Sequence, residues 1–248
     1  RTIDAMAVKR PDAIAPASVG GKSCVDCLVQ HLAVCSVLDH GELNRLNALL
    51  TPIELARGEP LFHEGEPADH VFNVTAGTLK LFRLLPDGRR QITGFLFPGD
   101  FLGLADKADY ICSAEAVTEV SLCRFQRQKL DDFFKEAPQL EGRLLDMARS
   151  ELAAFQDHML LLGRKSAKER IASFIMMLSE GAVRRGLGAN PVTIPMSRGD
   201  IGDFLGLTTE TVSRAITNLK RSGVITAGRD RKISIADMAA LAALAESA

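Results

Sequence analysis

Three of the chain's five cysteines, Cys24, Cys27 and Cys35, stand close together in the stretch SCVDCLVQHLAVC. Thiolates at this spacing can hold zinc or an iron–sulfur cluster, because they are soft ligands and one loop can wrap one side of a metal centre. They can also form a disulfide or a catalytic dithiol. An odd number of cysteines excludes a fully paired disulfide framework within one chain. Because the N-terminal stretch lacks the pattern of an export signal, we expect the reducing cytosol, where clustered thiols bind metal or sense oxidation.

A fourth ligand would have to come from Cys112, from Cys123 or from a histidine such as His31. For His31, a place on the surface is the more ordinary expectation. A catalytic dithiol at Cys24 and Cys27 would need a thioredoxin-type βαβ context, which the sequence does not show. Zinc, an iron–sulfur cluster and direct oxidation of the thiols therefore stay open, and a thiol oxidoreductase is disfavoured.

A second candidate site lies in the segment MSRGDIGDFLGLTTETVSRAITNLKRSGVI, which has the pattern of two short helices joined by a tight turn. Ser197 is placed to cap the first helix, and Gly206–Leu207 make the turn. Thr208 or Thr209 caps a second helix that runs to about Arg221. This pattern predicts a helix-turn-helix, whose second helix enters the major groove of DNA. The following GVITAGRDRKISI predicts a β-hairpin, so we expect a winged domain.

The N-terminal end of the second helix carries side chains that suit base recognition. Glu210, Ser213 and Arg214 are spaced i, i+3 and i+4, so they share one helical face. Arg214 can donate two hydrogen bonds to guanine, Glu210 can accept from cytosine, and Ser213 can contact a base edge or a thymine methyl group. A surface ion pair between Glu210 and Arg214 is the alternative. The wider set of expected DNA contacts, several of them to phosphates, is Arg198, Thr208, Thr209, Thr211, Lys220 and Arg221.

The chain is nearly neutral, with 30 Lys and Arg against 31 Asp and Glu, but its charge is unevenly distributed. The segment Gly163–Lys232 has 13 basic against 6 acidic residues, which leaves 17 against 25 in the remainder. A basic C-terminal third on an acidic body is typical of a nucleic-acid-binding module joined to another domain. No apolar run approaches the ~20 residues that span a bilayer, so we expect no membrane segment.

The elements that must position these sites begin with a strand-rich region. Between Thr51 and Phe125, short apolar runs alternate with glycines. Pieces such as HVFNV, TLKLFRLL and RQITGFLF predict strands, and Pro86–Gly88 predicts a tight turn between two of them. Regularly spaced short strands favour an antiparallel roll over a βαβ fold. With the helices that follow, the fold class is predicted to be α+β.

After Pro138, a helical period replaces the strand pattern and continues to about Lys165. Its apolar residues recur at alternating spacings of three and four, as in the seam of a coiled coil, which favours a parallel dimer over packing against the helix's own domain. The next segment, SAKERIASFIMMLSEGA, predicts another helix, with Ser166 and Glu169 forming a capping box. The predicted seam residues are Leu145, Ala148, Leu152, Phe155, Met159 and Leu162.

A β-roll, a long dimer-type helix and a winged helix-turn-helix, in this order, resemble the CRP/FNR superfamily of bacterial transcription regulators. The resemblance is carried by RGDIGDFLGLTTETVSR, QITGFLFPGDFLG and KERIASFI, and it extends over roughly residues 24–240. It implies a flexible N-terminus and cysteine-containing cluster loop in 1–50, and a cyclic-nucleotide-binding-like sensor roll in 51–137. It further implies a dimerisation helix in 138–165 and a DNA-binding domain in 166–248.

The FNR branch of this superfamily reads DNA through an E-x-x-S-R pattern, which Glu210, Ser213 and Arg214 match. The resemblance therefore implies an inverted repeat of TTGAT half-sites as the target. It also implies a contact between RNA polymerase and the Pro86–Gly88 loop, for which an ordinary hairpin turn is the alternative. The superfamily's roll often holds cyclic AMP through a Gly-Glu pair and an Arg-Ala stretch, but FLGLADKADYICSAEA stands in that place here. An anionic phosphate would lack its charge-assisted donor, so no cyclic nucleotide is expected.

For the cysteines, the resemblance implies a 4Fe–4S cluster held by Cys24, Cys27, Cys35 and Cys123. The stretch SAEAVTEVSLCRF resembles the family's strand that ends in the fourth ligand. Cys112 is then expected to be a small buried hydrophobic residue. The implied protein is a cytoplasmic, oxygen-responsive regulator, not an enzyme, whose dimer weakens when oxygen degrades the cluster. A regulator of the same fold that senses cysteine oxidation or another ligand, with no cluster, is the alternative.

One position departs from the family pattern. Phe155 stands in the seam where the family often places an acidic residue that repels its own copy in air, although Glu151 and Asp157 remain nearby. Without this repulsion, complete dissociation of the dimer in air is not expected.

Overall fold

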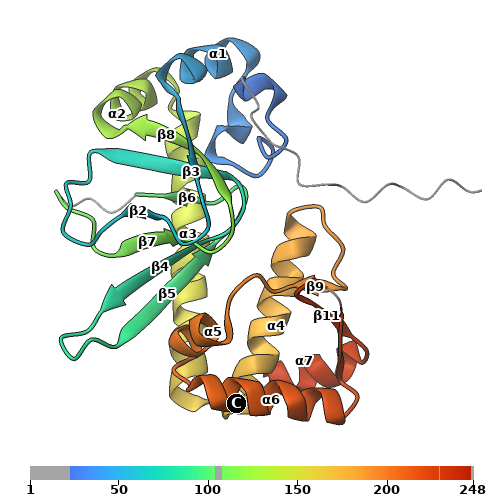
Figure 1. Ribbon diagram of the computed structural model, residues 1–248. Coiled ribbons are helices and arrows are strands. Elements are labelled where there is room, and N and C mark those ends of the chain that lie inside the picture. The colour runs from blue at the N-terminus through green and yellow to red at the C-terminus, as the bar shows by residue number, and fades with distance from the viewer. Residues whose placement is uncertain (1–22, 104–107, 229, 247–248) are drawn as a thin grey trace, which may run out of the picture.

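A computed structural model describes residues 23–103, 108–228 and 230–246 of the chain (Figure 1). Two parts of the chain lie outside the described residues. They are the predicted flexible N-terminus, 1–22, and residues 104–107, which belong to the segment that stands in place of the family's nucleotide-binding residues. A β-roll, a long helix and a winged helix-turn-helix follow one another along the chain, which confirms the predicted α+β class.

The roll consists of two four-stranded antiparallel sheets with strand orders β1-β8-β3-β6 and β2-β7-β4-β5. Large apolar side chains from both sheets, such as Phe62, Phe72 and Leu122, fill the space between them. At the turn after β3, Gly77 has φ of +83°, and a Cβ there would lie 2.0 Å from the Glu119 carbonyl oxygen, so only glycine fits. The strands are β1 (Thr51–Leu55), β2 (Pro60–Phe62), β3 (His70–Ala76), β4 (Leu79–Leu84), β5 (Arg90–Leu96), β6 (Phe101–Leu102), β7 (Ser113–Ala116) and β8 (Val120–Gln126).

Residues 23–50, predicted as a flexible N-terminus and loop, are instead mostly helical and packed. Asp39 and Glu42 form a capping box that begins a helix, a local pattern that the sequence already contains. Apolar side chains of the helix pack on the outer face of sheet β1-β8-β3-β6, against residues such as Val71 and Phe125. The segment contains the 3₁₀ helices η1 (Cys24–Asp26) and η2 (Val34–Val37) and the helix α1 (His40–Leu49).

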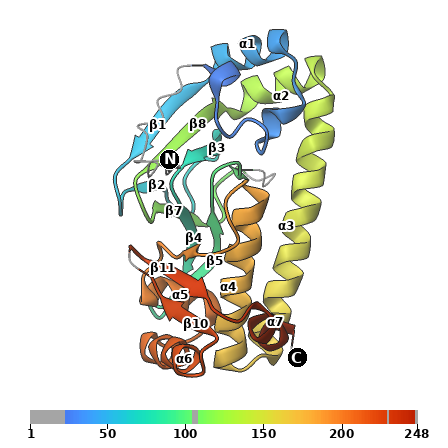
Figure 2. The same cartoon turned by 90° about the vertical axis from the view of Figure 1, so that its right-hand side faces the viewer.

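Two helices connect the roll to the C-terminal domain, α2 (Arg127–Glu136) and the 26-residue α3 (Gln139–Arg164). Figure 2 shows α3 running the length of the roll, from the N-terminal helices to the C-terminal domain. The side chain of Leu162 is half-buried, close to the turn at Gly206. The other predicted seam residues are exposed in the single chain, namely Leu145, Ala148, Leu152, Phe155 and Met159.

The C-terminal domain begins at the capping box of Ser166 and Glu169, as predicted. Its apolar core is continuous with the roll, because Ile92, Phe95 and Val117 of the roll belong to the same buried cluster. The predicted helix-turn-helix and hairpin are present, and the hairpin joins a third short strand in the order β10-β11-β9. No helix of the described residues is long and apolar enough to cross a membrane. The elements are α4 (Ala167–Arg184), β9 (Val192–Thr193), α5 (Arg198–Leu205), α6 (Thr209–Arg221), β10 (Ile225–Ala227), β11 (Lys232–Ile235) and α7 (Met238–Glu246).

Candidate thiol-lined centre and nucleic-acid interface

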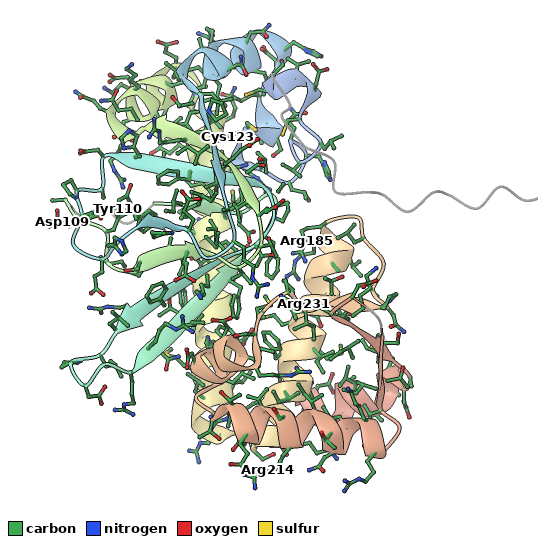
Figure 3. The ribbon with its side chains drawn as sticks, viewed as in Figure 1. Asp109, Tyr110, Cys123, Arg185, Arg214 and Arg231 are labelled. Atoms are coloured by element: carbon green, nitrogen blue, oxygen red, sulfur yellow. The ribbon has the colours of Figure 1, made fainter. Side chains whose placement is uncertain are left out.

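A cavity of about 80 Å³ lies between the N-terminal helices and the outer face of the roll, and four cysteines line it. Cys24 lies in η1, Cys27 follows η1 directly, and Cys35 lies in η2. Cys123 reaches the cavity from the middle of β8, far along the chain (Figure 3). Three segments thus bring together the four thiols that the sequence analysis grouped.

The cysteine segment is held between α1 and the sheet. The backbone N–H of Cys24 donates a hydrogen bond of 3.0 Å to Oδ1 of Asn47 in α1. On the sheet side, Cys123 lies opposite Pro52 of β1 and Asn73 of β3 in the strand register. Neither asparagine was predicted from the sequence, because only the folded chain brings them to the cysteines.

Three of the four thiols are held in their protonated form. Burial raises the pKa of Cys24 to about 11 and those of Cys35 and Cys123 to about 12, and repulsion from the neighbouring thiols adds to each shift. A catalytic dithiol requires the opposite, a lowered pKa, so this environment disfavours a thiol oxidoreductase. A metal centre would displace these protons and supply the positive charge that thiolates need in a buried site.

The remaining walls of the cavity are mostly apolar and include Leu46, Ile53 and Phe125. No group of three His, Cys, Asp or Glu side chains among the described residues is arranged so that it could hold a metal ion as it stands. Four thiolates lining one cavity are a donor set used both by zinc and by iron–sulfur clusters.

The two alternative ligands lie elsewhere. Cys112 precedes β7 and does not line the cavity. It is half-buried rather than buried as predicted, and it lies near the ion pair of Arg83 and Glu64. His31 is exposed, as expected, and does not line the cavity either.

The cysteine segment also contacts the long helix. Arg143 of α3 donates a hydrogen bond of 3.0 Å from Nη2 to the carbonyl oxygen of Leu32, between the second and third cysteines. Leu32 packs against Gly99, where a Cβ would lie 2.6 Å from the Leu32 Cβ. The Arg143–Leu32 hydrogen bond therefore connects the cysteine segment to the first turns of α3. No local pattern in the sequence predicts this contact.

The second candidate site is the exposed face of α6, at the opposite end of the molecule from Cys123 (Figure 3). Thr208 caps the helix by accepting a hydrogen bond from the backbone N–H of Thr211. Arg214 and Glu210 are exposed, and their charged groups are 3.7 Å apart. This is the surface pair considered as the alternative to base contact. An exposed pair of this kind contributes little to stability, so DNA bases can compete for both side chains.

The other expected DNA contacts differ in exposure. Arg198, at the start of α5, is half-buried, and its burial lowers the pKa of the guanidinium from its usual high value. Ser213 already donates a hydrogen bond to the Thr209 carbonyl oxygen, so it would have to turn to reach a base. Thr208, Thr209 and Lys220 are exposed on the same domain, and Thr211 is half-buried.

Helix α5 contacts the roll through ion pairs that are buried or partly buried, and these pairs were not predicted from the sequence. Asp200 accepts from Lys80 of β4 at 3.2 Å and from Arg90 of β5 at 2.9 Å. Arg90 also contacts Asp203 at 2.8 Å, and Lys80 contacts Glu115 at 2.7 Å. The roll and the DNA-binding domain are thus held together by a network that centres on one carboxylate.

Comparisons with known proteins agree with this architecture. Residues 52–137 match the family described as the cyclic nucleotide-binding domain, and residues 169–244 match the Crp-like helix-turn-helix domain. The nitrogen fixation regulation protein FixK of Bradyrhizobium diazoefficiens is 43% identical over 225 residues, covering 91% of this chain and 94% of that protein. The transcriptional activator protein FnrL of Cereibacter sphaeroides is 36% identical over 222 residues, covering 88% and 90%.

Among solved structures, FixK2 from Bradyrhizobium japonicum is similar, with a TM-score of 0.74 and 38% identity over 80% of this chain and 98% of that chain. The agreement extends over the roll, the long helix and the DNA-binding domain. The chain therefore belongs to the CRP/FNR superfamily of transcription regulators, and it is a DNA-binding regulator rather than an enzyme.

Proposed function

We propose that this regulator responds to oxygen through a 4Fe–4S cluster held by Cys24, Cys27, Cys35 and Cys123. The observation that carries the proposal is the convergence of these four thiols, from three segments, on one cavity. When bound, such a cluster supplies the reactivity toward oxygen that sensing requires. The raised pKa values of three of the thiols speak against the alternative of direct thiol oxidation, because the protonated thiol is the less reactive form.

We propose that the presence or absence of the cluster affects the dimer helix α3 through the Arg143–Leu32 hydrogen bond. A filled cavity holds η2 in place and keeps the first turns of α3 fixed against the roll. An empty cavity leaves the same segment with fewer restraints, and the start of α3 loosens with it.

The regulator is proposed to act as a parallel homodimer that pairs through α3. Its exposed apolar side chains recur at coiled-coil spacing, so a second copy would bury them. Phe155, which is 44% exposed in the single chain, would add apolar contact instead of charge repulsion. The dimer is therefore proposed to weaken in air without dissociating completely.

The proposed DNA target is an inverted repeat of TTGAT half-sites, because two copies related by a twofold axis present two α6 helices to one palindrome. Arg214 reads a guanine, with Glu210 and Ser213 beside it. The turn Pro86–Gly88 between β4 and β5 is proposed to contact RNA polymerase. Leu84 and Leu85 beside this turn are exposed, which gives the turn an apolar surface.

The roll is not proposed to bind a cyclic nucleotide. Tyr110 stacks on Phe62 with ring centroids 3.7 Å apart, and its hydroxyl donates to the His70 carbonyl oxygen. These rings belong to the apolar filling of the roll. The described part of the segment that replaces the nucleotide grip carries no arginine for a phosphate.

The test is anaerobic purification of the full chain, with iron, acid-labile sulfide and zinc measured on the same sample. We expect about four iron and four sulfide per chain, together with thiolate-to-iron absorbance that air bleaches. Stoichiometric zinc in a colourless sample would overturn the cluster. Metal-free protein whose DNA binding still responds to oxidants would favour direct sensing by the cysteines.

A further inference from the structure

Asn73 is a buried polar residue in an apolar part of the molecule. It lies in the middle of β3, its exposed fraction is only 5%, and its side chain lines the thiol cavity. Val71 on the same face of the strand belongs to the apolar cluster under the N-terminal helices. An amide in such surroundings lowers stability unless hydrogen bonds satisfy it.

The amide of Asn73 is poorly satisfied within the described residues. Its Oδ1 has no hydrogen-bond partner, and Arg143 Nε is the one other buried side-chain atom there in the same condition. Its Nδ2 donates to the Val74 carbonyl oxygen over 3.3 Å, which is long for such a bond. That carbonyl already accepts from the backbone N–H of Gly99 at 2.9 Å. The amide is therefore free to turn without leaving Val74 unpaired.

The strand register places this amide beside one of the four thiols. Asn73 and Cys123 are directly opposite each other on β3 and β8. Side chains opposite each other in an antiparallel pair share a face and have Cβ atoms about 5 Å apart. The register shifts immediately afterwards, between Val74 and Ala76, so the strand is irregular at the edge of the cavity.

We propose that Asn73 tunes the thiol centre, and that its amide N–H would donate a hydrogen bond to the Cys123 thiolate when the centre is occupied. This inference rests on the cluster proposed above. An amide suits both states of the cavity, because its oxygen can accept from a protonated thiol and its nitrogen can donate to a thiolate. This role explains why Asn73 Oδ1 has no partner in the described residues and why its Nδ2 makes only a long bond to the Val74 carbonyl oxygen. The amide is available to a group bound in the cavity.

Such a hydrogen bond would tune the cluster. Donors to the sulfur atoms stabilise the more negatively charged, reduced form, and so raise the reduction potential. Loss of the donor would lower the potential and make the cluster easier to oxidise. Asn73 would thereby set how much oxygen the regulator tolerates before it responds.

The test compares Asn73→Leu, which keeps the size of the side chain and removes the amide, with Thr78→Val as the matched control. Thr78 is also a buried polar residue of the roll but does not line the cavity. The full-length proteins are purified anaerobically, and cluster content, midpoint potential and the half-time of bleaching in air are measured. We expect Asn73→Leu to bind the cluster, with a more negative potential and a half-time shortened about threefold or more, and Thr78→Val to match the parent protein.

A second measurement separates this role from a structural one. Because Asn73→Leu removes an unsatisfied buried amide, the Tm of the cluster-free variant should equal or exceed that of the parent. A lowered Tm with unchanged potential and bleaching would make Asn73 structural and overturn the proposal. Equal shifts of the potential in Asn73→Leu and Thr78→Val would also overturn it. A parent protein without any cluster would instead sink the proposed function itself.

Discussion

The thiol cavity and the recognition helix α6 lie at opposite ends of the molecule and are built in opposite ways. The cavity is buried, and its four cysteines come from η1, the residue after it, η2 and β8. The recognition face belongs to one 13-residue helix, and its key side chains are exposed and lie within one turn of each other. A local pattern thus suffices to build the DNA-reading face of α6, which we call the reading end. The thiol cavity, by contrast, exists only when distant segments are folded together.

The two regions also differ in how well their ionisable groups are hydrated. Around the cysteines, loss of hydration dominates and raises the pKa values of three thiols far above neutral pH. At α6, Glu210 and Arg214 are both well hydrated, and their pair is weak. The buried end favours thiolates only when a bound metal centre compensates their charge, and the exposed end is suited to exchange one partner for another.

The largest expected effect is loss of the cluster, and it tests whether the four cysteines of the cavity act together as its ligands. Because Cys123 lines the cavity and Cys112 does not, Cys123→Ser should abolish the cluster, whereas Cys112→Ser should leave iron and sulfide content unchanged. Iron and sulfide analysis of both variants, purified anaerobically alongside the parent, checks this. The reverse result, with the cluster lost only in Cys112→Ser, would reassign the fourth ligand.

The second prediction concerns α3, which links the two ends. Leu152 and Leu160 are about equally exposed, at 60% and 63%, but only Leu152 lies on the predicted seam. Placing Asp at residue 152 in both copies should weaken the dimer by roughly 4 kcal/mol, or about a thousandfold in its dissociation constant. Sedimentation equilibrium of Leu152→Asp and Leu160→Asp under anaerobic conditions measures the change. Equal weakening by both variants would show that α3 does not pair through this seam.

The third prediction tests the reading end alone. Arg214→Ala should lower affinity for the cognate palindrome by about 1–3 kcal/mol per half-site and relax the preference at one base pair. Lys220→Ala should instead weaken binding to all sequences and reduce its salt dependence. Binding titrations on cognate and scrambled DNA at two salt concentrations distinguish them. An equal loss on both DNAs for Arg214→Ala would make it a phosphate contact.

What the sequence could predict follows the same division. Ser197, Thr208 and Gly206 act through neighbours only a few residues away, so their roles in the helix-turn-helix were predicted and are present. Cys123 could be chosen over Cys112 only by family resemblance, because the register of β8 against β3 decides which thiol reaches the cavity. The buried partners Asn73, Asn47 and Arg143 were not predicted. Their roles arise from contacts between distant segments, which leave no periodic pattern.

Asp200 combines both kinds of interaction in one side chain, and it provides the smallest of the predicted effects. Burial opposes its ionisation, but the hydrogen bond from Ser197 and the charge of Lys80 outweigh burial and lower the pKa of the carboxyl. The Ser197 bond is the local capping box, and the Lys80 contact crosses from the roll. Asp200→Asn should therefore lower the free energy of unfolding by about 1.5–3 kcal/mol near neutral pH.

The pH dependence of that difference follows from the lowered pKa. A carboxyl whose pKa is lower in the folded state contributes its full stabilisation above the unfolded value of about 3.9, and loses it as pH falls through the folded value. The gap between the parent and Asp200→Asn should stay constant from about pH 5 to 8 and close only in acid below about pH 4. Urea unfolding of both proteins across this range measures the gap, with Asp87→Asn as a control because Asp87 pairs only in an exposed turn. A stability difference that persists in strong acid would mean that the altered shape of the side chain, not its charge, lowers the free energy of unfolding. The contact between α5 and the roll would then not depend on the ionised carboxylate of Asp200.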